Sequence, residues 1–182
     1  MEIGSTYSAR CVCTVARARI GGLQVVSDLF DDLALARIEQ QIDGWLAHLQ
    51  ANNAAILAVD RSVDGDIRWY VRMKGEEKEF TTVWLTLGQR TLRYETYVMP
   101  APEENAEALY ESLLRRNEKL IGAHFSIGAE DAVFLRGELL LGSLNENELD
   151  RAIGTLYSTV EQYFKGFLQI GFASRFNSQS GN

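Results

Sequence analysis

The strict alternation of polarity from Ile67 to Lys74 constrains the fold of this chain more than any other feature. In the segment IRWYVRMK, four apolar residues alternate with three charged residues and a tyrosine. Because successive side chains of a β-strand point to opposite faces, this pattern predicts a strand with one buried face and one wet face. Such a strand is typical of an antiparallel sheet that has a core side and a solvent side.

Three neighbouring segments also have the composition of β-strands. They are AAILAVD (54–60), EFTTVWLTL (79–87) and TLRYETYV (91–98). Short turn-forming sequences separate the segments: Asp64-Gly65-Asp66, Gly75-Glu76-Glu77 and Gly88-Gln89. Four strands joined by such short turns predict an antiparallel meander.

Three longer segments place apolar residues three and four positions apart, which is the spacing of an amphipathic helix. They are LALARIEQQIDGWLAHLQA (33–51), PEENAEALYESLLRRNEKL (102–120) and the stretch 145–167. In the second segment, Pro102 suits a first helical turn, and we expect Glu103 and Glu104 to act as helix-start charges. In the third, either Asn145 or Asn147 is expected to cap the helix.

A second hairpin is predicted between the last two helices. The segments AHFSIG and AVFLRGELL flank the acidic turn Ala129-Glu130-Asp131. The expected fold class is therefore α+β, an antiparallel sheet made of a four-strand meander plus a hairpin, with three helices. We expect one domain over residues 28–176, a flexible extension at 1–27 and a polar tail at 177–182.

The charge of the chain limits its partners. The formal net charge is -7, and residues 1–27 contain three arginines and one glutamate, a net of +2, so the remaining residues carry -9. An acidic chain repels phosphate backbones and anionic lipids, which argues against nucleic acid and membranes as partners. No apolar run reaches the roughly 18 residues of a membrane span. The sequence thus predicts a cytoplasmic protein.

The residue types that catalysis and metal binding require are scarce. Cys11 and Cys13 supply two soft ligands, whereas a structural zinc site needs four. His48 and His124 are the only histidines, and no G-x-S-x-G motif accompanies them. The stretch GELLLGSL lacks the lysine of a phosphate-binding loop. We therefore predict no catalytic residues, no metal and no cofactor, and we expect that the protein is not an enzyme.

Aromatic residues concentrate on the predicted central strands. In the segment 79–87, Val83 and Leu85 point to one face, while Phe80 and Trp84 point to the other. Apolar groups on both faces predict that the second face is covered, either by another element such as the C-terminal helix, by a subunit or by a bound peptide. The residues predicted to form a partner-binding surface are Trp69, Trp84, Tyr94 and Tyr97.

An alternative function is a sensor or enzyme for a small anionic molecule, with a pocket between sheet and helix. Arginine side chains suit the recognition of carboxylate or phosphate. The predicted ligand-binding residues for this alternative are Arg115, Arg116, Asn117 and His124.

Two stretches of the chain resemble the bacterial YbjN family of sensory transduction regulators. They are TVWLTLGQRTLRYETYVMPAPEENAEALYESLLRRNEKL and FSIGAEDAVFLRGELLLGSLNENELDRAIGTLYSTVEQYF, and the resemblance extends over residues 31–176. It implies a type III secretion chaperone-like fold, often dimeric, that serves binding and regulation without an established catalytic centre. We accordingly expect a cytosolic homodimer that binds an unidentified protein or peptide client through an apolar sheet face or a strand edge.

Overall fold

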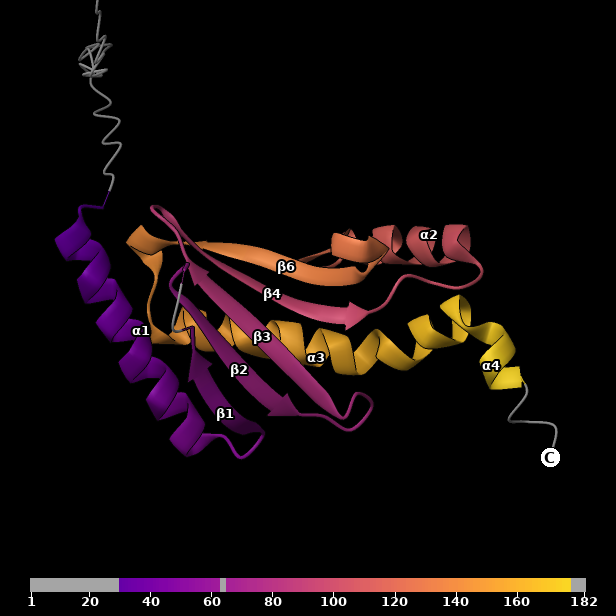
Figure 1. Ribbon diagram of the computed structural model, residues 1–182, viewed down its shortest axis with the longest axis horizontal. Coiled ribbons are helices and arrows are strands. Elements are labelled where there is room, and N and C mark those ends of the chain that lie inside the picture. The colour runs from indigo at the N-terminus through magenta and orange to yellow at the C-terminus, as the bar shows by residue number, and fades with distance from the viewer. Residues whose placement is uncertain (1–29, 63–64, 178–182) are drawn as a thin grey trace, which may run out of the picture.

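The computed structural model describes residues 30–62 and 65–177, which form a six-stranded antiparallel sheet with helices (Figure 1). The strand order is β1-β2-β3-β4-β6-β5. The strands are β1 (Ile56–Arg61), β2 (Arg68–Lys74), β3 (Phe80–Leu87), β4 (Thr91–Met99), β5 (His124–Ile127) and β6 (Val133–Leu140). This order confirms the predicted meander plus hairpin, with the hairpin joined to the meander by the pairing of β4 with β6.

The three predicted helices are present, and a short fourth one follows them. They are α1 (Asp32–Asn52), α2 (Ala106–Asn117), α3 (Glu146–Gly171) and α4 (Ala173–Asn177), and the 3₁₀ turns are η1 (Ala129–Asp131) and η2 (Leu141–Ser143). The Asn145 side chain caps α3 by accepting the Glu148 N–H at 3.1 Å. The Asp31 carboxylate caps α1 in the same way, at 2.7 Å from the Ala34 nitrogen. Both helices thus begin where a side chain satisfies a free backbone donor.

The start of α2 differs from the prediction. The helix begins at Ala106, after Asn105 in the left-handed conformation (φ 52), and not at the proline. The N–H groups of Glu103 and Glu104 donate to the Gly171 carbonyl at 3.0 and 3.1 Å. The Glu104 carboxylate accepts from the Ser174 N–H and hydroxyl. These glutamates therefore bind the junction of α3 and α4 and are not helix-start charges for α2.

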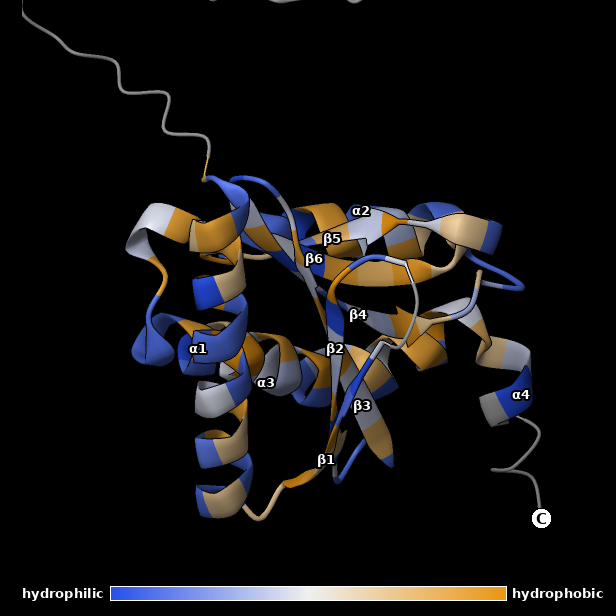
Figure 2. Cartoon of the chain, turned by 60° about the vertical axis from the view of Figure 1, so that its left-hand side comes forward, coloured by the Kyte–Doolittle hydropathy of each residue, from blue (hydrophilic) through white to orange (hydrophobic). Residues whose placement is uncertain are grey.

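The helices pack on one face of the sheet. Helix α3 contacts β3, β4 and β6, α1 contacts β1 and α3, and α2 contacts β5 and α3. Figure 2 shows α1 beside α3 at one end of the sheet and α2 beside β5 at the other. In Figure 1, β2 and β3 pass in front of α3, and no described helix lies in front of these strands. The sheet thus has one helix-covered face and one open face.

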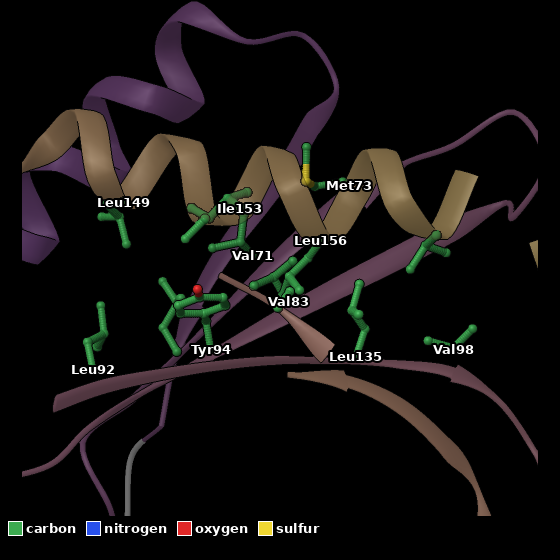
Figure 3. Close-up of a cluster of buried hydrophobic side chains, with 14 of the residues drawn as sticks. Val71, Met73, Val83, Leu92, Tyr94, Val98, Leu135, Leu149, Ile153 and Leu156 are labelled. Atoms are coloured by element: carbon green, nitrogen blue, oxygen red, sulfur yellow. The ribbon is translucent and has the colours of Figure 1, made fainter. Parts of the chain in front are cut away.

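The core lies between α3 and the covered face (Figure 3). Leu149, Ile153 and Leu156 of α3 point towards Val83 and Leu135 of the sheet, and all five side chains are buried. In β2, Trp69, Val71 and Met73 are buried, so the predicted alternation of this strand is confirmed. Helix α1 adds Ile38, Ile42 and Leu46.

Some predictions concern residues outside the described part. The extension 1–27, with Cys11 and Cys13, and residues 178–182 of the predicted tail belong to this group. The division of the chain into these segments remains a prediction. Within the described ranges, no helix combines the length and the apolar character that a membrane crossing requires.

Candidate functional site

Four aromatic rings gather on the open face of the sheet. Tyr70 and Trp84 lie opposite each other on β2 and β3, and Tyr97 and Phe134 lie opposite each other on β4 and β6. Ring centroids are 6.5 Å apart for Tyr70 and Trp84, 6.0 Å for Trp84 and Phe134, and 5.7 Å for Tyr97 and Phe134. These spacings suit edge-on aromatic contacts. We call these four residues the outer aromatic cluster.

Four arginine–carboxylate pairs surround this cluster. They are Arg68–Asp66 at 3.5 Å, Arg72–Asp60 at 3.6 Å, Arg93–Glu138 at 3.6 Å and Arg136–Glu95 at 2.7 Å. The Arg136 guanidinium also lies over the Phe134 ring, 4.7 Å from its centroid. Tyrosine, tryptophan and arginine are the residues that dominate binding at protein interfaces. The open face therefore has the composition of a protein-binding surface.

Two of the four residues predicted for the partner-binding surface lie on the opposite face, and this corrects the prediction that the four share one surface. Trp69 is 1% exposed and Tyr94 is 2% exposed. The Trp69 indole N–H donates to Asp43 of α1 at 2.6 Å, and the Tyr94 hydroxyl donates to the Gly122 carbonyl. Burial raises the pKa of the Tyr94 hydroxyl. These two aromatic residues belong to the core.

Trp84 and Tyr97, the other two, do lie together on the open face. The sequence analysis missed Tyr70 and Phe134 as their neighbours. Tyr70 could have been found, because it alternates with buried residues in β2. Phe134 stands between the buried Val133 and Leu135, so no alternation marks the face to which its ring belongs.

The residues predicted for the alternative ligand site are engaged in contacts within the protein. Arg115 pairs with Glu111 one turn earlier in α2, at 2.9 Å. Arg116 donates to the Ser112 carbonyl at 3.0 Å and lies over the rings of Tyr163 and Phe167, so it attaches α2 to α3. His124 instead lines a surface depression together with Arg93, Arg136 and Glu138, and neither Arg115 nor Arg116 belongs to that lining.

Asn117, the third residue of that predicted site, binds the outer edge of β5. Its amide nitrogen donates to the Phe125 carbonyl at 3.2 Å, and its amide oxygen accepts the Phe125 N–H at 2.7 Å. A neighbouring strand would bind the same two backbone groups. Since unpaired strand edges promote strand-to-strand association, Asn117 protects this edge.

We expect Asn117→Ala to lower the free energy of unfolding by about 1 to 2 kcal/mol, because two backbone groups lose their partners. The variant should also self-associate more than the native protein, since the β5 edge becomes available. Urea unfolding and light scattering measure the two effects. Asn147→Ala, at an exposed position of α3, is the matched control and should change neither quantity. An Asn117→Ala variant that matches this control in both measurements would contradict the role of the amide.

Polar contacts from α3 fix the loop between β2 and β3. The Glu161 carboxylate of α3 accepts the N–H groups of Glu76, Glu77 and Lys78 at 2.6, 3.0 and 3.3 Å. The Lys78 ammonium donates to the carbonyls of Tyr97 and Val98 and lies over the Tyr97 ring. Burial lowers the pKa of Lys78 to about 8, and the nearby Glu161 carboxylate opposes this shift. The loop thus holds a lysine beside the outer aromatic cluster.

The lowered pKa of Lys78 makes stability depend on pH. Between pH 8 and 10.5 the unfolded chain holds more protons than the folded one, so the free energy of unfolding increases as the pH rises. We expect a gain of about 1.5 kcal/mol from pH 8 to about 9.5, before the tyrosines begin to ionise. Lys78→Met should remove this gain, and Lys165→Met should keep it. Urea unfolding at several pH values tests the expectation, and a slope that survives in Lys78→Met would disprove it.

Comparison with known proteins gives matches over most of the chain. The model of the YbjN family, described as "Putative bacterial sensory transduction regulator", matches residues 39–169. An uncharacterized protein of Mycobacterium leprae is 31% identical over 126 residues, 69% of this chain and 68% of its own length. An uncharacterized protein of Mycobacterium bovis is 33% identical over 104 residues, and the matched part spans 57% of each chain.

Two solved structures of protein complexes contain a chain that aligns with this one. A chain of the ExsC–ExsE complex aligns with a TM-score of 0.51 and 17% identity over 70% of this chain and 93% of its own length. A chain of the heterodimeric ExoU–SpcU complex from the type III secretion system of Pseudomonas aeruginosa aligns with a TM-score of 0.47 and 14% identity, over 68% and 95% of the two chains. The first likeness confirms the predicted type III secretion chaperone-like fold.

Proposed function

Because the chain belongs to the YbjN family, we propose that it is a non-enzymatic, chaperone-like or regulatory protein that binds a segment of a partner protein. The fold supports this proposal, since the ExsC–ExsE structure is that of a complex between two proteins. Fold alone is a weak guide to function, so the argument depends on the surface of this chain.

The observation that carries the proposal is the outer aromatic cluster on a sheet face that no described helix covers. Tyr97 is 36% exposed. Phe80 is 48% exposed and belongs to the same face of the neighbouring strand β3. Contiguous exposed apolar groups are rare on the surface of a monomer and often mark a protein interaction site. Tyrosine, tryptophan and arginine are also the residues that contribute most to binding at such sites.

Two finer features belong to the same proposal. We infer that the working unit is a homodimer and that it acts in the cytoplasm, as the chaperone-like fold and the acidic composition favour. Sedimentation at micromolar concentration measures the oligomeric state, and a single species with the mass of one chain would contradict the homodimer. Fractionation of native cells measures the location of the protein.

The experiment that tests the function is affinity capture of partners from native cytosol, followed by mass spectrometry. The tagged full chain is compared with its Trp84→Ala and Leu114→Ala variants. Both residues are apolar, and Leu114 is 69% exposed on α2, away from the open face. We expect defined partners that Trp84→Ala captures at least about tenfold less well and that Leu114→Ala retains.

Circular dichroism and thermal unfolding must first show that both variants are folded. Equal capture by the native chain and by Trp84→Ala would exclude the open face as the binding surface. Loss of capture in both variants would point instead to an effect on the fold or on assembly.

A further inference from the structure

Beside the outer aromatic cluster, the open face contains a depression of about 460 Å³. It lies where the four-residue strand β5 begins and the longer strand β6 continues beyond it. Its lining consists of Arg93, Gly122, His124, Arg136, Gly137 and Glu138. Two arginines, a histidine and the Glu138 carboxylate therefore converge on one hollow next to the outer aromatic cluster.

The arginines in this depression keep donor groups available. Arg93 is 3.6 Å from Glu138, and the two side chains are 60% and 52% exposed, so this pair is loose and open to solvent. Arg136 forms an ion pair with Glu95, at 2.7 Å between Nε and a carboxylate oxygen, and its guanidinium lies over the Phe134 ring. A planar guanidinium binds a carboxylate through two parallel hydrogen bonds, which an incoming acid could form with Arg93.

The charge distribution also favours an acidic partner at this face. The four arginine–carboxylate pairs of the open face sum to zero, whereas residues 28–182 together carry -9. The rest of the surface consequently repels an acidic segment, and the open face does not. Residues 1–27 carry +2 and so do not complement the arginines of the depression. A nucleic acid, with a phosphate at every nucleotide, would meet the surrounding negative surface.

Resting on the function proposed above, we propose that the partner segment is acidic, and that one of its carboxylates binds in the depression between Arg93, Arg136 and His124 while an apolar side chain packs on the outer aromatic cluster. The partner is thus an extended protein segment with both an apolar and an acidic residue.

The register of the sheet sets the distance between these two residues. Trp84, Glu95, Arg136 and His124 lie opposite one another in a single row across β3, β4, β6 and β5. Trp84 and Arg136 are two strands apart, which is about 9.6 Å at the usual strand spacing. An extended chain advances about 3.3 Å per residue, so the apolar and acidic residues of a segment that crosses the strands stand about three positions apart.

Short fluorescent peptides test this inference on the full chain. The first peptide carries a tryptophan with aspartates about three positions away, and in the second peptide asparagines replace the aspartates. Fluorescence anisotropy should show the acidic peptide binding at least about tenfold more tightly than the asparagine peptide, an advantage of about 1.4 kcal/mol. Arg93→Gln should abolish this advantage and leave the asparagine peptide unaffected. Arg115→Gln, which removes the same charge from an exposed site on α2, should preserve it.

A charge reversal provides a stricter test. In Arg93→Glu, the preference should change to a third peptide in which lysines replace the aspartates, a result that misfolding does not produce. Equal binding of the acidic and asparagine peptides, or no binding of either, would overturn the inference. A short oligothymidylate that binds with the same dependence on Arg93 would also overturn it, in favour of a phosphate ligand.

The two proposals fail in different ways. If Trp84→Ala weakens both peptides and Arg93→Gln weakens neither, the open face binds protein segments without selecting for acid. In that case the proposed function stands and the carboxylate site does not. If capture from cytosol is unaffected by Trp84→Ala, the proposed function itself fails.

Discussion

Trp69→Ala should lower the free energy of unfolding by about 3 to 5 kcal/mol, the usual cost of removing a fully buried tryptophan. The indole is 1% exposed, and its N–H donates to Asp43 of α1. The substitution therefore leaves a cavity under α1 and also removes one of the two partners of the Asp43 carboxylate, the other being Arg61. Because the stability of a domain is only about 5 to 15 kcal/mol, much of the protein should be unfolded in mild denaturant.

Trp84→Ala is the matched comparison, since the same residue type is removed from the neighbouring strand. Trp84 lies on the open face, where it contacts Tyr70 of the neighbouring strand β2 and Phe134 of β6, and such aromatic contacts are worth about 1 kcal/mol each. We expect a loss of about 1 kcal/mol and an intact fold. Urea unfolding followed by circular dichroism compares the two variants, and equal losses would show that the two tryptophans do not differ in burial.

Gly137→Val should cost at least about 3 kcal/mol, because there is no room for a side chain at this position of β6. A Cβ atom there would overlap the Gly122 carbonyl and lie 2.5 Å from the Tyr94 ring. The Gly122 oxygen belongs to the backbone and accepts the Tyr94 hydroxyl, so neither neighbour can move without breaking that hydrogen bond. We expect a much lower melting temperature, measured by calorimetry.

Gly154→Ala serves as the control for this substitution. No atom lies within 4 Å of a Cβ placed at Gly154, which is in the middle of α3. Alanine is a better helix former than glycine, so this variant should gain about 0.5 to 1 kcal/mol. A tolerated valine at position 137 would mean that the strands β4 and β6 and the segment around Gly122 are less tightly packed than the structure indicates.

The fold could be predicted from the sequence because local patterns determine most of it. The alternation in residues 67–74 predicted the burial of Val71 and Met73, and the helical spacing predicted three helices. The exception at the start of α2 has a physical cause. Glu103 and Glu104 contact Gly171 and Ser174, about seventy residues later, and no local pattern reports such a contact.

The candidate site could be predicted only in part, because it depends on the register between strands. Trp69 and Trp84 are the same residue type on the neighbouring strands β2 and β3. In the paired strands, however, Trp69 lies opposite Leu85, and Trp84 lies opposite Tyr70. The two indoles consequently belong to different faces. Arg93 and His124 approach each other through the pairing of β6 with both β4 and β5, which joins three segments of the chain.

The amide of Asn117 has a consequence for the growth of any assembly. A sheet with two usable borders can add copies at both ends, which leads to an open-ended filament. Here one border is β5, where the Asn117 amide already binds the Phe125 backbone, so we expect another strand to pair at the β1 border. When two such molecules join by their β1 borders, the combined sheet ends in a closed border on each side. We therefore expect any strand pairing between copies to stop at two.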